Sequence, residues 1–160
     1  MTEGAPTRIR KATEDDIPRL LDCLQVVFAP YRDSYTPGAF LDTVLTEATA
    51  RERLRAMAVF VAVDPSDTVV GTVAAARVSA SEGHLRGMAV RPEAQGSGVA
   101  TELLHRALGY LASIGCRRVT LGTTAPLVRA SRFYERNGFH RSGRMTDFHG
   151  MELHEYVREL

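Results

Sequence analysis

The segment PEAQGSGVATELLHRAL (92–108) constrains the fold more than any other part of the chain. It places two glycines in front of apolar residues that recur at the spacing of one helix face, so we predict a helix from about 98 to 114. β-Branched and apolar residues on either side predict strands at 84–90 and 116–123. A strand, a helix and a second strand in this order form a β-α-β crossover, which joins parallel strands. The sheet must therefore contain at least one parallel pair.

The rest of the chain adds strands that are joined by short turns. Two runs rich in valine and alanine, 57–64 and 68–79, lie at hairpin distance and lead into the strand 84–90, which predicts an antiparallel meander. Hairpins combined with one crossover require a mixed sheet, so the predicted class is α+β. The predicted strands are 7–13, 57–64, 68–79, 84–90, 116–123, 139–145 and 151–160, and the predicted helices are 14–28, 39–56 (as one helix or two short pieces), 98–114 and 126–138.

Length and composition narrow the class of protein. A chain of 160 residues has the size of one domain, so we expect a single domain over 1–160 with its core at about 8–159. The 20 basic and 19 acidic residues give no net field that would attract nucleic acid or a membrane, and neither partner is expected. Cys23 and Cys116 have no metal-ligand spacing, and no metal is expected. Without an apolar leader or a membrane-length apolar run, we expect a cytoplasmic protein.

The glycine turn predicts an anion site. The first N–H groups of a helix have no partner within the helix and carry partial positive charge, so a phosphate can bind there without a basic side chain. Gly96 and Gly98 allow the backbone to come close to such an anion. The alternative is a tight turn without a ligand, in which Ser97 only caps the helix. Walker and dinucleotide motifs are excluded, because no lysine follows the turn and no acidic residue follows the next strand.

Two motifs at a characteristic separation resemble a known family. HLRGMAVRPEAQGSGVATELLHRAL (84–108), followed by FYERNGF (133–139), is similar to the GNAT superfamily of acetyl-CoA-dependent N-acyltransferases. The resemblance implies that family's fold, a mixed, splayed seven-stranded sheet flanked by four helices. It also implies direct, sequential transfer of an acetyl group from acetyl-CoA to a primary amine; an acetyl-CoA-binding regulatory module without turnover is the alternative. The residues that match the family pattern are Val90, Pro92, Gln95, Gly98, Ala100, Tyr134, Gly138 and Phe139.

The resemblance implies where acetyl-CoA, the one cosubstrate expected, would bind. Gly87 suits the bulge that splays this strand in the family. The backbone groups that would pair with the pantetheine arm, like an added strand, belong to Met88, Ala89 and Val90. The amides that would hold the pyrophosphate belong to Gln95, Gly96, Ser97, Gly98, Val99, Ala100 and Thr101. Many relatives bind the pantetheine with an asparagine where this chain has Leu127. The hydroxyl residues that could replace that asparagine are Thr123, Thr124 and Ser131.

Candidate catalytic residues follow from the same resemblance. Tyr134 occupies the position of the group that protonates the departing thiolate, and a phenol with a usual pKa of about 10 can do so; the alternative is a core tyrosine. Relatives often place a glutamate at the start of the fourth strand, where this chain has His84, with Glu82 two residues earlier. His84, Glu82 or water is therefore the candidate base. Alternation places both residues on one face with Arg86, and a bulge at Gly87 would flip the residues that follow.

The acceptor is expected at the opposite mouth of the cleft, beneath the segment 29–38. This segment offers Tyr31, Arg32 and Tyr35 to a polar amine, or it packs on itself. No feature identifies the acceptor, which can be a small-molecule amine or a peptide amine. The last segment, 151–160, is typical of a long edge strand and would permit a homodimer.

Overall fold

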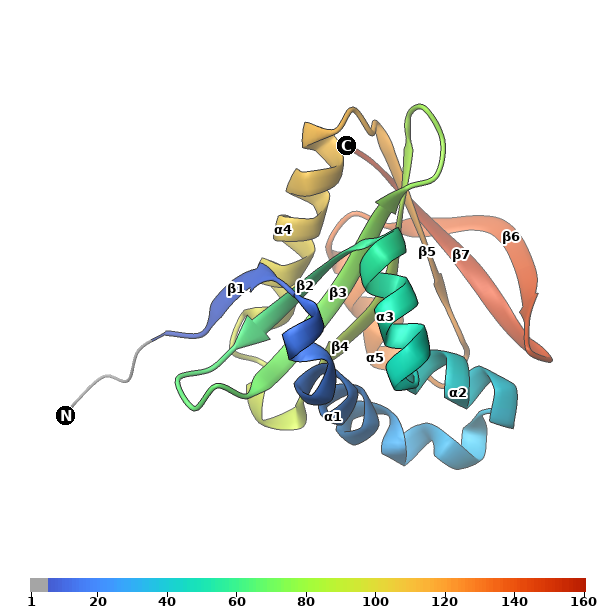
Figure 1. Cartoon of the computed structure of the whole chain (residues 1–160). Coiled ribbons are helices and arrows are strands. Elements are labelled where there is room, and N and C mark those ends of the chain that lie inside the picture. The colour runs from blue at the N-terminus through green and yellow to red at the C-terminus, as the bar shows by residue number, and fades with distance from the viewer. Residues whose placement is uncertain (1–5) are drawn as a thin grey trace.

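The computed structural model describes residues 6–160, which form a mixed seven-stranded sheet between two layers of helices (Figure 1). The strand order is β1-β2-β3-β4-β5-β7-β6, and the pair β4–β5 is parallel whereas the other neighbours are antiparallel. The predicted α+β class and the predicted parallel pair are confirmed. The strands are β1 (Arg8–Lys11), β2 (Ala58–Val63), β3 (Val69–Arg77), β4 (Glu82–Val90), β5 (Arg118–Thr123), β6 (His140–Phe148) and β7 (Met151–Glu159), and the helices are α1 (Ile17–Phe28), α2 (Pro37–Val44), α3 (Glu47–Ala56), α4 (Val99–Ser113) and α5 (Val128–Arg136).

Each face of the sheet has its own apolar core. Helices α1, α2 and α3 cover one face, and α4 and α5 cover the other (Figure 1). The family resemblance implies four helices, whereas residues 6–160 contain five α-helices because the segment 39–56 forms two short pieces, α2 and α3, which was one of the two predicted alternatives. The division falls at Leu45, whose φ of 65° ends α2, and Thr46 caps α3 by accepting from the Thr49 N–H at 3.2 Å.

Helix α4 supplies the largest apolar face toward the sheet. It begins after Gly98, whose φ is 91°, and it is followed by Gly115 with a φ of 97°. These bounds agree closely with the predicted helix 98–114. Burying each large apolar side chain of this face stabilises the fold by roughly 1.5–3 kcal/mol. The buried residues of α4 are Val99, Leu103, Leu104, Ala107, Leu108 and Leu111.

A bulge interrupts β4 at Gly87. The pairing with β3 passes from Ala74↔Arg86 to Thr72↔Ala89, so two residues of β4 lie opposite one residue of β3. Gly87 takes up the irregularity with a φ of 65°. After the bulge the faces are exchanged: Ala89 packs in the core under α1–α3, and Val90 packs in the core under α4. The predicted register flip is therefore present.

The same bulge coincides with the separation of β4 from β5. The parallel pairing covers only Glu82↔Arg118, Gly83↔Val119 and His84↔Thr120. Beyond His84 the two strands diverge, and the sheet is splayed as the resemblance implies. The opening between the carboxyl ends of β4 and β5 is where an α/β crossover is expected to bind a ligand.

The position of β7 corrects one expectation. The segment 151–160 was expected to be an edge strand, but β7 pairs with β5 on one side and with β6 on the other. The edge at this end of the sheet is β6, which the sequence places at 139–145 and which extends to Phe148 through an irregular register between Arg141 and Met145. An edge-to-edge dimer at this end of the sheet would therefore have to use β6.

The strained glycine of the bulge has a measurable effect on stability. We expect Gly87→Ala to lower the free energy of unfolding by about 1–2 kcal/mol, because a φ of 65° disfavours a side chain and the new Cβ would lie 2.9 Å from Nη1 of Arg53. Gly109→Ala is the control, since Gly109 is helical and its Cβ would meet nothing within 4 Å. It should raise stability by up to about 1 kcal/mol. Urea unfolding measures the free energy of unfolding of both variants. Equal changes in the two would contradict the strain at Gly87.

Candidate active site

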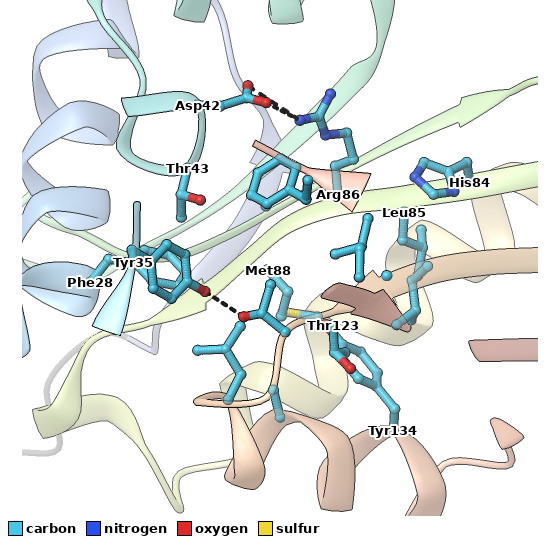
Figure 2. A pocket seen from close by; sticks show the side chains of 18 of the residues that line it. Phe28, Tyr35, Asp42, Thr43, His84, Leu85, Arg86, Met88, Thr123 and Tyr134 are labelled. Carbon is cyan, nitrogen blue, oxygen red and sulfur yellow. Dashed lines mark hydrogen bonds and ion pairs between the residues drawn. The ribbon is translucent and has the colours of Figure 1, made fainter. Parts of the chain in front are cut away.

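Two adjoining cavities occupy the opening between β4 and β5. Their volumes are about 460 and 450 Å³. The larger, the acceptor-side cavity, lies among α2, α3, β4, β5 and β7 (Figure 2). The smaller, the turn-side cavity, lies among α1, β4, α5 and the turn before α4. The residues that line both cavities are Phe28, Met88, Leu127 and Ala130, so the two spaces share one wall.

The turn-side cavity is bordered by unpaired backbone donors. The predicted turn residues that line it are Gln95, Gly96, Gly98, Ala100 and Thr101. A Cβ on Gly96 or Gly98 would meet nothing within 4 Å, so both glycines face open space. Among the described residues, the backbone N–H groups without a hydrogen-bond acceptor include those of Gly96, Gly98, Val99, Ala100 and Thr101. Such a cluster of free N–H groups at a helix N-terminus fits a phosphate or pyrophosphate.

Two predicted turn residues do not line this cavity with their side chains. The Ser97 hydroxyl donates to the Ala94 carbonyl, and the Val99 side chain is buried in the core beneath α4. Val99 can serve a ligand here only through its backbone N–H, whereas the Ser97 N–H already donates to the Ala94 carbonyl at 3.3 Å. Gln95 does line the cavity, where its amide donates to the Val90 carbonyl at 3.2 Å and ties the turn to the end of β4.

A strand edge forms the wall of the turn-side cavity. The predicted residues Met88, Ala89 and Val90 line it, and none of the three is paired with β5. Apolar side chains of α1 and α5 stand opposite, including Val27 and Phe133. An extended chain with amide groups could therefore lie along β4 as an added strand, with apolar surface on its other side.

Tyr134 reaches the acceptor-side cavity from α5. Its ring is 6% exposed and packs edge-on against Phe133 and Phe139, with centroids 5.5 and 5.7 Å apart. Among the described residues, the tyrosine hydroxyls with hydrogen-bond partners belong to Tyr35 and Tyr156, so that of Tyr134 is free to meet a ligand. Burial raises its pKa above the usual value, so the phenol stays protonated near neutral pH.

Of the two predicted bases, His84 lines the acceptor-side cavity and Glu82 lines neither cavity (Figure 2). His84 Nδ1 lies 2.9 Å from Oγ1 of Thr120, which orients the ring. Burial, with the nearby Arg86, lowers the pKa of His84 below its usual value, and Glu155 and Glu82 oppose this shift. The imidazole is therefore neutral near pH 7. Glu82 faces Arg118 instead, at 4.0 Å.

The three hydroxyls considered in place of the family asparagine lie in different surroundings. Thr123 and Thr124 line the acceptor-side cavity, and the Thr124 hydroxyl is hydrogen-bonded to that of Tyr35 at 2.8 Å. Ser131 lies 3.4 Å from Thr123 but lines a separate cavity of about 370 Å³ behind β5. Leu127 itself lines both central cavities as an apolar wall.

The segment predicted to cover the acceptor is partly packed on itself. Tyr35 lines the acceptor-side cavity, and burial raises the pKa of its hydroxyl. Tyr31 lines the turn-side cavity instead. Arg32 lines neither and stacks on the Phe40 ring, with its guanidinium carbon 4.3 Å from the ring centroid. Of the three residues, Tyr35 therefore faces the acceptor-side cavity, Tyr31 the turn-side cavity and Arg32 a ring of α2, and their role in acceptor binding stays a prediction.

A cluster of charged residues in the acceptor-side cavity was not identified from the sequence. Arg86 Nη2 lies 3.3 Å from both carboxylate oxygens of Asp42, and His149 Nε2 lies 3.1 Å from the same carboxylate (Figure 2 shows the first pair). Arg53 of α3 completes the wall. Asp42 and Arg53 stand on the polar side of a predicted helix, where charged residues are ordinary. A contact with a distant part of the chain is what distinguishes such residues. Asp42, for example, pairs with Arg86 of β4, which is 44 positions away.

Neither a metal-binding cluster nor a membrane-spanning helix is found in residues 6–160. No group of three or more His, Cys, Asp or Glu residues in this range is arranged to hold a metal ion. None of the helices described is both long enough and apolar enough to cross a membrane.

The comparison with family models yields one assignment. The model described as the acetyltransferase (GNAT) family matches residues 21–139. No curated protein matches the chain in sequence.

Solved structures share the fold over nearly the whole chain. An acetyltransferase of the GNAT family from Staphylococcus aureus Mu50 is 17% identical, with 97% of this chain and 99% of that one covered and a TM-score of 0.79. PaiA N-acetyltransferase from Thermoplasma acidophilum, in complex with coenzyme A, is 15% identical, with 98% and 100% covered and a TM-score of 0.81. YncA from Salmonella typhimurium, with its cofactor acetyl-CoA, is 17% identical, with 98% and 95% covered and a TM-score of 0.74. At such identities the likeness concerns the fold.

The protonation state of His84 can be measured directly. We expect its pKa, followed by NMR of the 15N-labelled imidazole, to lie below 6.5. Because the unfolded chain then binds the proton more readily than the folded one, this residue lowers stability as the pH falls through about 6.5. Arg86→Gln should raise the pKa by removing a nearby positive charge. Arg55→Gln, on the exposed side of α3, should leave the pKa of His84 unchanged. A His84 pKa above 6.5 in the wild type would contradict the effect of burial.

Proposed function

This chain belongs to the acetyltransferase (GNAT) family, and we propose that it transfers an acetyl group from acetyl-CoA to a primary amine. One observation carries the proposal. Free N–H groups at the start of α4 open into a cavity that continues along the unpaired edge of β4 to Tyr134. An anion site, a strand edge and a proton donor thus follow one another along a single opening.

The residues present fit acetyl-CoA. The free N–H groups of Gly96 and of residues 98–101 would hold its pyrophosphate, while those of Gln95 and Ser97 are paired within the turn. The β4 edge at Met88–Val90 would accept the amide groups of its pantetheine arm. When bound, acetyl-CoA supplies the acetyl group as a thioester. Thr123 or Thr124 can bind the arm from β5 in place of the family asparagine, since both line the adjoining cavity. The structures of PaiA with coenzyme A and of YncA with acetyl-CoA support this assignment through their shared fold.

Acetyl transfer to an amine requires two proton movements. A new bond joins the amine nitrogen to the acetyl carbon while the carbon–sulfur bond breaks, so the nitrogen must lose a proton and the sulfur must gain one. Tyr134 is suited to donate, because burial keeps its hydroxyl protonated and no protein partner competes for it among the described residues.

His84 is suited to accept the proton from the amine, directly or through water. Its lowered pKa leaves the imidazole neutral near pH 7, and Thr120 holds the ring at the cavity wall. Glu82 is less well placed, because it lines neither cavity and faces Arg118. Water alone is the remaining alternative.

Direct transfer, without an acetylated enzyme, is supported by the cysteines. Cys23 is fully buried in the core beneath α1–α3, where burial raises its pKa to about 11. Cys116 is 4% exposed and packs in the other core. Neither lines the two cavities, so neither thiol is placed to take up the acetyl group.

The proposed function is tested by binding and by turnover. We expect calorimetry to detect acetyl-CoA binding, and thiol release to occur with at least one member of a panel of primary amines. Gly98→Ala should weaken binding about 10-fold or more, because its Cβ would point into the open space before the free amides. Gly115→Ala is the matched control, with a similar positive φ and equally open space at the far end of α4.

Each outcome of this test has a distinct meaning. Equal loss of affinity in the two glycine variants would assign the effect to strain rather than to the anion site. Tight binding without turnover on any amine would favour an acetyl-CoA-binding regulatory module. No binding at all would refute both functions.

The role of Tyr134 is tested by removing one oxygen atom. Tyr134→Phe should lower kcat by roughly 10- to 10,000-fold, with little change in acetyl-CoA affinity, since a general acid acts on the departing sulfur. Tyr110→Phe is the control, because Tyr110 packs against Phe60 and lines neither central cavity. Steady-state thiol release measures kcat, and unchanged turnover in Tyr134→Phe would remove this residue from the mechanism.

A further inference from the structure

The acceptor-side cavity has an excess of positive charge. The charged side chains that line it are Asp42, Arg53 and Arg86, two cations and one anion. His84 and Tyr134, which also line it, are neutral for the reasons given above. Glu82 and Glu155 are close enough to influence His84 but line neither central cavity. A second ammonium group on the acceptor would be repelled by this wall, and an anionic group would be attracted.

The carboxylate of Asp42 is already engaged. It accepts from Arg86 Nη2 through both oxygens at 3.3 Å, and one of the same oxygens lies 3.1 Å from His149 Nε2. Arg86 is about 40% exposed, so water also solvates it. The positive charge left over in the cavity is therefore that of Arg53.

Arg53 has no acidic partner in the part of the chain that the structure describes. None of the ion pairs and none of the side-chain hydrogen bonds within residues 6–160 includes its guanidinium. Burial, with the charge of Arg86, lowers its pKa to about 10 against the opposing charge of Asp42, which still leaves it protonated at pH 7. Asp42 attracts this partly buried cation without forming an ion pair with it, so a bound anion would stabilise the guanidinium further.

The guanidinium lies directly over the bulge of β4. Its Nη1 is 2.9 Å from the position that a Cβ on Gly87 would take, so a side chain there would displace the guanidinium from its present place. The next residue, Met88, begins the unpaired strand edge along which the acetyl donor would lie. An anion bound to Arg53 would therefore be close to the reacting nitrogen, and the acceptor must carry both groups a short distance apart.

We propose that the acceptor is a free α-amino acid whose carboxylate is bound by the guanidinium of Arg53. In such a molecule one carbon atom separates the amine from the carboxylate, which suits a guanidinium that lies against the bulge where the unpaired edge of β4 begins. The N-terminus of a peptide has no carboxylate at this distance, and a polyamine has none at all. The side chain would meet the apolar part of the wall, which is formed by Leu121, Phe148 and Leu153.

This inference rests on the proposed function and makes its acceptor specific. The α-amine forms the bond to the acetyl carbon, the carbon–sulfur bond breaks, and the products are the N-acetylamino acid and free coenzyme A. The carboxylate takes no part in the chemistry. Arg53 is thus a binding residue that determines specificity, and its loss should act mainly on KM.

The first test uses the wild-type protein and compares three amines of similar size as acceptors. Leucine, leucinamide and 3-methylbutylamine share one apolar side chain, and only leucine carries a carboxylate. We expect kcat/KM, expressed per unprotonated amine, to be about 10- to 100-fold higher for leucine, the range of one charge-assisted hydrogen-bonded pair. Equal or better acetylation of the amide or the plain amine would overturn the proposal and leave the proposed function standing.

The second test changes the guanidinium. In Arg53→Gln the preference for leucine over 3-methylbutylamine should fall about 10- to 100-fold through a higher KM for leucine, and Arg53→Lys should retain part of it. Arg55→Gln, an exposed arginine on the same helix, should keep the wild-type preference. Acetyl-CoA affinity reports whether each variant is folded. A full preference for leucine in a folded Arg53→Gln would overturn the proposal.

A binding measurement separates this proposal from the proposed function. If no amine is acetylated, the proposed function fails. Calorimetry of leucine with the coenzyme A-loaded protein still decides whether Arg53 binds the carboxylate of an amino acid. Binding that is present in the wild type and lost in Arg53→Gln would uphold the carboxylate site. No binding of leucine to the wild type would overturn it.

Discussion

The bulge in β4 is the constraint on which the rest of the site depends. Two residues, Gly87 and Met88, stand opposite one residue of β3, and the parallel pairing with β5 ends at His84. Had β4 continued in register with β5, its backbone groups would be paired within the sheet and no extended ligand could join its edge. The bulge also reverses the faces, so that Ala89 and Val90 pack in opposite cores from those that simple alternation predicts. An irregularity in one strand thus creates both the opening and its wall.

Burial has opposite consequences at the two kinds of group along this opening. For Tyr134 and His84 it disfavours the charged form, which leaves a phenol able to donate a proton and an imidazole able to accept one at the same pH. For Arg53 the charge persists, because the lowered pKa of about 10 is still far above neutrality. The free N–H groups at the start of α4 carry partial positive charges that do not change with pH. The opening therefore has positive potential at the turn before α4 and at Arg53, and it is also lined by two groups that are uncharged near neutral pH.

The sequence predicts those features that neighbouring residues determine. The apolar spacing of α4, the glycines at its two ends and the strands on either side depend on contacts within a few residues, and these predictions agree with the structure. The order β5-β7-β6 depends on pairing between distant segments, so the interior position of β7 was predicted wrongly. The ion pair of Asp42 with Arg86 joins residues 44 positions apart. No local pattern distinguishes such residues from the solvated charges of an ordinary helix surface.

The same reasoning explains why the two halves of the site differ in how well a sequence reveals them. The turn-side half works through backbone N–H groups, and the glycines and the helix start that expose them are contiguous in the chain. The acceptor-side half is lined by side chains from α2, α3, β4, β5 and β7, which lie far apart in the sequence. A contiguous backbone motif is therefore easier to recognise in a sequence than a wall assembled from distant side chains. In this chain the two halves meet at Gly87, because the glycine that opens the strand edge also leaves the space that Arg53 fills.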